Sequence, residues 1–193
     1  MATLAPLTDS NAQVTPELFD TMLERGDFEA IHIELLNGTI VFKMSQNRLD
    51  ILALSHLIEV IAPLAPPAGL RVITQGTIRM GEDRPEPDFA LLDYDSRRLS
   101  RPLVASDVRL AVEVAVTSLA TDRRDKAPFY ASQGIPEYWI INPVARQVEI
   151  YRQPSGEAYG SLRVAGEDEA IDALALPGSS ILVADLMPLP DSE

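Results

Sequence analysis

The segment that most constrains the fold is residues 108–117, the best strand candidate in the chain. It is rich in valine and other apolar residues, and only Arg109 and Glu113 are charged. With a period of two, one face of this strand is entirely apolar: Val108, Leu110, Val112, Val114 and Val116. The other face carries Glu113 between Ala111 and Ala115. A carboxylate there must be solvated, paired with Arg109 two residues away, or bound to a metal.

The elements after this strand predict a parallel crossover. A helix is expected between residues 121 and 133, and Gly134 and Pro136 mark the turn into a strand at 137–141. A strand, a helix and a strand in this order favour a crossover connection within one sheet. The strand at 147–151 then folds back antiparallel.

The N-terminal part predicts a helix and a hairpin. Residues 1–14 indicate a flexible arm, and Thr15 and Pro16 are suited to the N-cap and first helical position of a helix over 16–25. Asn37-Gly38 is a strong hairpin signal, here between strands at 30–36 and 39–44.

A second helix at 49–64, strands at 70–74 and 87–92, and a polar loop at 93–107 complete the first half. Weaker strands are expected at 162–164, 171–176 and 181–183. Together the elements predict one α/β domain over 15–187, followed by a tail at 188–193. Its mixed β-sheet is flanked by helices, with an N-terminal helix-hairpin and a β-rich C-terminal tail. We expect the 87–92 and 108–117 strands to be neighbours, with helices 16–25 and 49–62 on one side of the sheet and helix 122–133 packed across it from the Glu113 strand.

Composition excludes several classes of site. The chain has 193 residues, a formal net charge of −13 and no cysteine, so disulfide scaffolds, thiol catalysis and bulk electrostatic binding of nucleic acid are excluded. With two histidines, a bound metal must be a hard, oxygen-liganded ion. There is no signal-peptide pattern and no apolar run long enough to span a membrane, so we expect a cytoplasmic protein.

A second carboxylate begins the next-best strand. Asp88 follows Pro87 and shares a strand face with Ala90 and Leu92. If this strand neighbours the Glu113 strand, the two acids can meet and chelate a divalent cation. The alternative for Asp88 alone is a cap in a Pro-Asp turn.

Several of these residues occur in a pattern that resembles a known family. The ordered set comprises Pro87-Asp88, the run from Glu113 to Asp122, Lys126, Tyr130, the segment at 134–140 and the strand at 148–151. Glu34 in the Glu-Leu-Leu-Asn-Gly segment fits the same pattern. From about residue 15 to 186, this arrangement resembles the bacterial family of putative restriction endonucleases, in the PD-(D/E)XK nuclease superfamily.

The resemblance implies a restriction-endonuclease-like fold and a Mg²⁺- or Mn²⁺-dependent site that hydrolyses DNA. Asp88 and Glu113 would hold the metal. Lys126 would take the place of the superfamily lysine, because the position two after Glu113 is Ala115. Asp122, four residues before Lys126, would hold that lysine in place, and Glu34 is a weaker supporting candidate.

Two further expectations concern the substrate and assembly. Because the net charge is negative, DNA would be held locally; Arg123 and Arg124 are weak candidates, as are Arg97, Arg98 and Arg101 in the loop. A homodimer is plausible for a duplex-cutting enzyme. Val116 stands where the family often has Asp or Ser, and a histidine expected after the hairpin is missing. These departures favour the alternative, an inactive nuclease-fold protein that serves as a binding or assembly module.

Overall fold

The computed structural model describes residues 13–28, 31–43, 46–93 and 101–189, so most of the predicted arm and part of the tail lie outside it. Its centre is a six-stranded mixed sheet in the order β3-β4-β5-β6-β7-β8. The strands are β3 Arg71–Thr74, β4 Phe89–Leu92, β5 Val108–Val114, β6 Glu137–Asn142, β7 Gln147–Ser155 and β8 Ala158–Gly166. β5 and β6 pair in parallel and the other neighbours are antiparallel. The predicted mixed sheet, crossover and β4–β5 adjacency are confirmed.

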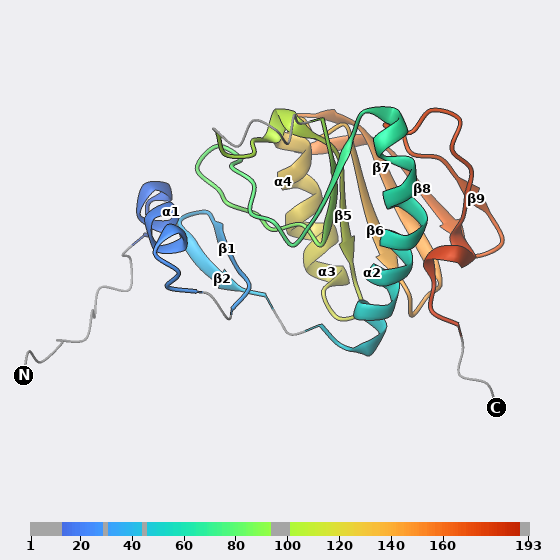
Figure 1. Cartoon of the computed structure of the whole chain (residues 1–193), viewed down its shortest axis with the longest axis horizontal. Coiled ribbons are helices and arrows are strands. Elements are labelled where there is room, and N and C mark those ends of the chain that lie inside the picture. Colours follow the sequence, from blue (N-terminus) through green and yellow to red (C-terminus); the bar gives the residue numbers. More distant parts are fainter. Residues whose placement is uncertain (1–12, 29–30, 44–45, 94–100, 190–193) are drawn as a thin grey trace, which may run out of the picture.

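Helices cover both faces of this sheet (Figure 1). Helix α2, Arg48–Ile61, packs its apolar side, including Leu57 and Ile61, with Leu110 and Val112 of β5. Alternate residues of β5 point the other way and pack with α4, Ala127–Ser132. Both faces of β5 are therefore buried, and Glu113 lies on the face covered by α4.

Helix α1, Pro16–Glu24, has the predicted Thr15 cap but not the predicted place. It packs against the hairpin of β1, Ile33–Leu36, and β2, Thr39–Phe42. Phe19 forms a small separate core with Ile33 and Leu35, and Figure 1 shows this unit at one end of the molecule. The prediction that this helix lies beside α2 on the sheet was wrong. Its short apolar stripe is already covered by the hairpin.

The crossover helix begins at Leu119, two residues before the expected range of 121–133. It runs from α3, Leu119–Thr121, through one π-helical turn, η4, Asp122–Lys126, into α4. Within that turn the Ala127 amide donates to the Asp122 carbonyl, five residues back. Pro128 has no amide hydrogen and its ring crowds the carbonyl four residues earlier, and a widened turn accommodates both effects.

The C-terminal part is β-rich, as expected, although its strands differ in length. β7 and β8 form a longer hairpin than the predicted segments, whereas β9, Ala170–Ile171, and β10, Ile181–Leu182, are short. Short 3₁₀ turns connect the remaining parts: η1 Ala62–Leu64, η2 Pro66–Ala68, η3 Ala105–Asp107 and η5 Val183–Leu186. Within the part of the chain that the structure describes, no helix is both long and apolar enough to cross a membrane.

Candidate active site

The pairing of β4 with β5 brings the two predicted acids together. Phe89 pairs with Val112 and Ala90 with Ala111, so one more step of the register sets Asp88 opposite Glu113. Asp88 also lies on the same face as Ala90, which packs on the α4 side with Ala111. The alternation read from the sequence thus places both carboxylates on one face of two neighbouring strands.

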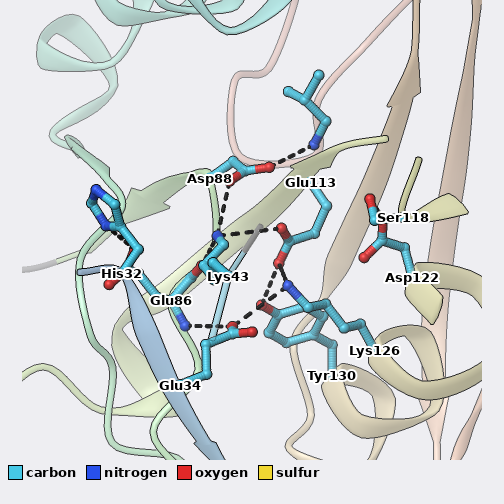
Figure 2. A network of polar contacts seen from close by, with 11 residues as sticks. His32, Glu34, Lys43, Glu86, Asp88, Glu113, Ser118, Asp122, Lys126 and Tyr130 are labelled. Carbon is cyan, nitrogen blue, oxygen red and sulfur yellow. Dashed lines mark hydrogen bonds and ion pairs between the residues drawn. The ribbon is translucent and has the colours of Figure 1, made fainter. Parts of the chain in front are cut away.

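Glu113 is buried and surrounded by donors from other elements (Figure 2). Its Oε1 accepts from Lys126 Nζ at 2.8 Å and from the Tyr130 hydroxyl at 3.0 Å. Burial raises the pKa of the Glu113 carboxyl to about 8, although the ammonium groups of Lys126 and Lys43 act in the opposite direction. The solvated-face alternative and the pairing with Arg109 were wrong, because Arg109 pairs with Asp93.

Asp88 uses its two oxygens differently. Oδ2 accepts the main-chain amide of Val114 at 2.9 Å, which fixes the carboxylate against β5. Oδ1 accepts Lys43 Nζ at 2.9 Å, and the same ammonium lies 4.0 Å from Glu113 Oε2. The Asp88 and Glu113 oxygens are therefore no more than about 6.9 Å apart, the sum of those two distances. This bound lies below about 8 Å, the separation beyond which a shared cation would be excluded, although two oxygens that bind one cation must come within about 5 Å of each other.

The hairpin contributes a cation and an acid to this site (Figure 2). Lys43 follows β2 and also donates to the Glu86 carbonyl at 2.6 Å. Burial lowers the pKa of Lys43, but the Glu113 and Asp88 carboxylates outweigh it, so the pKa is raised and the ammonium stays charged. From β1, Glu34 accepts the Glu86 amide at 2.8 Å and lies 3.5 Å from Lys126 Nζ. The sequence prediction that Glu34 reaches the same cleft agrees with these contacts.

Asp122 is near the site but does not make the predicted contact with Lys126. It accepts a hydrogen bond from Ser118 Oγ at 2.6 Å, while Lys126 turns to Glu113 and Glu34. The expected pairing assumed α-helical spacing, and the π turn η4 changes how residues four apart face each other. Burial raises the pKa of Asp122, and the charge of Lys126 opposes that rise.

The arginines proposed to hold substrate have carboxylate partners. Arg123 pairs with buried Glu149 of β7, and Arg124 pairs with its neighbour Asp125 at 2.7 Å. Arg101 forms a two-point contact with Asp107. Arg97 and Arg98 lie outside the described residues. A substrate-binding role for these arginines stays a prediction.

A cavity of about 280 Å³ opens onto the acids. Residues of the hairpin, β4, β5 and the crossover helix line it, among them Glu34, Lys43, Asp88, Glu113, Asp122 and Lys126. In the described part of the chain, no three acidic or histidine side chains are arranged to hold a metal by themselves. Two carboxylates and the Glu86 carbonyl nevertheless surround one cationic atom, and such hard oxygen donors suit Mg²⁺, which keeps several waters.

Sequence reasoning missed Lys43 and gave Tyr130 no role. Tyr130 stands four residues after Lys126, so the helical spacing could have placed both side chains beside Glu113. Amino-acid composition could have drawn attention to Lys43, because lysine is rare in this chain. The chain has 14 arginines and two lysines, and both lysines, Lys43 and Lys126, lie in this site.

Comparisons with known proteins agree with this description. The sequence matches the profile of the family Uma2, described as "Putative restriction endonuclease", over residues 16–184. A crystal structure of a putative nuclease belonging to DUF820, from Anabaena variabilis ATCC 29413, superposes with a TM-score of 0.69 at 16% identity. The superposition covers 90% of this chain and 97% of that one, which establishes a shared fold. A search of curated proteins gave no significant match. The chain therefore belongs to the Uma2 family of putative restriction endonucleases, and a nuclease-like role follows from that membership.

Proposed function

We propose that this protein is a metal-dependent endonuclease of the PD-(D/E)XK type that hydrolyses phosphodiester bonds in DNA. The observation that carries the proposal is the position of Asp88, directly before β4, beside Glu113 of β5, with Lys126 at 2.8 Å from Glu113. Burial of charged groups costs free energy of folding, and here two acids and a lysine are buried together at a cavity. Such clusters are typical of functional sites.

Two of these residues would hold a cation, and a third would stabilise the negative charge that develops on the phosphate. Asp88 and Glu113 would hold Mg²⁺ or Mn²⁺, with the Glu86 carbonyl as the nearest main-chain oxygen. When bound, the ion would supply Lewis-acid activation of the attacking water and neutralise charge on the scissile phosphate. Lys126 would stabilise the negative charge that develops there or orient the water.

Supporting residues fix these groups in place. Glu34 holds Lys126 from the hairpin, and Tyr130 holds one oxygen of Glu113. Asp122 supports the crossover helix through Ser118. Because the protein carries a net charge of −13, the DNA must be held by local contacts, and binding should weaken steeply with salt.

A second candidate, an inactive binding or assembly module, is favoured by one observation. The ammonium of Lys43 contacts Asp88 and that of Lys126 contacts Glu113, so each acid has a cationic partner within the protein itself. A protein that had lost catalysis could keep the fold in this way. The two candidates differ in whether divalent metal raises the melting temperature, since a ligand stabilises the folded state that binds it.

Cleavage of plasmid DNA with Mg²⁺ or Mn²⁺ at low salt tests the proposal. Asp88→Ala, Glu113→Ala and Lys126→Ala should each lower the cleavage rate by about 100-fold or more, because each removes a group at the reacting centre. Glu157→Gln is the matched control, since Glu157 is an exposed acid on the distant β7–β8 turn. It should leave the rate unchanged.

The same variants separate the two candidates. Absence of cleavage by the wild-type protein, with no thermal shift in either metal, would favour the binding module. Cleavage that persists in Glu113→Ala would mean that the activity comes from elsewhere.

A further inference from the structure

The ammonium of Lys43 sits among three oxygens. It lies 2.6 Å from the Glu86 carbonyl, 2.9 Å from Asp88 Oδ1 and 4.0 Å from Glu113 Oε2. A carbonyl and two carboxylates are the donors that a hard divalent cation prefers. The side chain is 15% exposed, so this is an interior position rather than a surface pairing.

The remaining oxygens of the two acids already have other partners. Asp88 Oδ2 accepts the Val114 amide, and Glu113 Oε1 accepts Lys126 and Tyr130. The oxygens that face Lys43 are therefore the ones left for a cation. Figure 2 shows Lys43 Nζ between Asp88 and Glu113, with Lys126 on the opposite side of Glu113.

We propose that Lys43 occupies the divalent-cation position in the metal-free protein and that metal binding expels its ammonium. This inference rests on the metal site proposed above. The Lys43 ammonium and a divalent ion would compete for the same three oxygens, which are the Glu86 carbonyl, Asp88 Oδ1 and Glu113 Oε2.

Lys43 is better placed to leave than Lys126. Both lysines line the cavity of about 280 Å³, and Lys43 is the more exposed, 15% against 11%, so its flexible stem can carry the ammonium toward water. Lys126 lies between Glu34 and the other oxygen of Glu113, so it retains both partners after the exchange. In this chain lysine, rather than the far commoner arginine, stands where a compact cation must come and go.

Calorimetric titration of Mn²⁺ into the metal-free protein near pH 8 tests the inference. Lys43→Gln should bind Mn²⁺ about tenfold more tightly than wild type, since it lacks the internal competitor. Lys126→Gln is the matched control, because it removes the same charge from the other side of Glu113. It should tighten binding by less than Lys43→Gln does, since the Lys126 ammonium contacts the Glu113 oxygen that faces away from Lys43. Asp88→Asn should abolish binding, and Lys43→Met repeats the test with the apolar stem retained.

The wild-type protein offers a direct readout without any substitution. The chain has two lysines, so acetylation followed by mass spectrometry reports on both at once. Mn²⁺ should accelerate modification of Lys43 several-fold and leave Lys126 unchanged. A Lys43 that reacts no faster with metal present would contradict expulsion even if the Lys43 variants failed to fold.

The outcomes separate this inference from the proposed function. Equal gains in Lys43→Gln and Lys126→Gln, or no gain in Lys43→Gln, would overturn the exchange while Asp88-dependent binding upheld the metal site. If the wild type and every variant fail to bind Mn²⁺, the metal site and the exchange fall together.

Discussion

At the scale of single residues, the chemistry centres on one buried acid. Glu113 is 2% exposed and contacts two ammonium groups and a phenol. Even with these partners, burial keeps the pKa of its carboxyl at about 8, far above the ordinary value of 4.5. Without metal, Glu113 therefore takes up a proton when the protein folds at neutral pH.

This proton uptake gives a pH-dependent stability. A carboxyl whose pKa is raised on folding contributes stability fully below 4.5 and loses it as pH rises through about 8. In EDTA, the free energy of unfolding of wild type should fall relative to Glu113→Gln, by up to about 1.4 kcal/mol per pH unit across this window. Urea denaturation of both proteins near pH 5.5 and pH 9 measures the difference. A gap that stays constant, or that changes in the opposite direction, would contradict the raised pKa.

The residue scale also shows what the sequence could reveal about the site. Period-two alternation placed Asp88 and Glu113 on matching faces, and β4–β5 pairing makes them neighbours. The contact between Lys43 and Asp88 could not be predicted in this way, because the two residues are 45 positions apart in the sequence. It forms only when the hairpin packs against the sheet, and that packing depends on long-range contacts.

At the scale of elements, local signals with a specific hydrogen-bonding role predicted structure best. Thr15 caps α1, and Asn37 and Gly38 both adopt the positive φ that the predicted hairpin turn requires. The π turn η4 and the position of α1 were not predictable in this way. The π turn depends on how Pro128 is accommodated once the helix has packed on the sheet. The position of α1 depends on whether its apolar stripe covers the hairpin or the sheet.

Helix α2 offers a test of such a local signal. Asn47 forms a full capping box: its side chain accepts the Leu49 and Asp50 amides, and Asp50 accepts the Asn47 amide. Asn47→Ala should lower the free energy of unfolding by about 1 kcal/mol, because main-chain donors at the helix start lose their acceptor. Chemical denaturation measures this loss. Ser55→Ala, an exposed change within the same helix, is the control and should stay within about 0.5 kcal/mol.

At the scale of the whole molecule, α1 and the hairpin form a unit that several contacts attach to the rest of the protein, and Arg84 makes the contacts to both α1 and β1. Arg84 pairs with Leu35 through main-chain hydrogen bonds of 2.8 and 3.2 Å. Its buried guanidinium also makes two bonds to Asp20 of α1. This unit supplies Glu34 and Lys43, so the candidate site depends on its attachment.

Loss of the Arg84 side chain should loosen this attachment. Arg84→Met removes two hydrogen bonds to Asp20, which still pairs with Arg79 at 3.1 Å, so the cost should be about 1–3 kcal/mol. Hydrogen exchange should then accelerate in residues 33–42 while β5 and β6 stay protected. Arg25→Met is the control, since Arg25 makes an exposed pair with Asp27 in the same unit. Uniform acceleration across the sheet would show that the unit does not move separately.

The division of the site between hairpin and sheet also sets an order for its assembly. A hairpin with a two-residue turn forms in about 1–10 μs, whereas a parallel pair joined by a crossover helix must close a long loop first. Neither event alone joins Lys43 to Asp88. We expect the site to be the last part of the molecule to mature, after the hairpin docks on a finished sheet. A newly made chain can therefore have every strand paired and still lack the arrangement of Lys43 and Glu34 around Asp88 and Glu113.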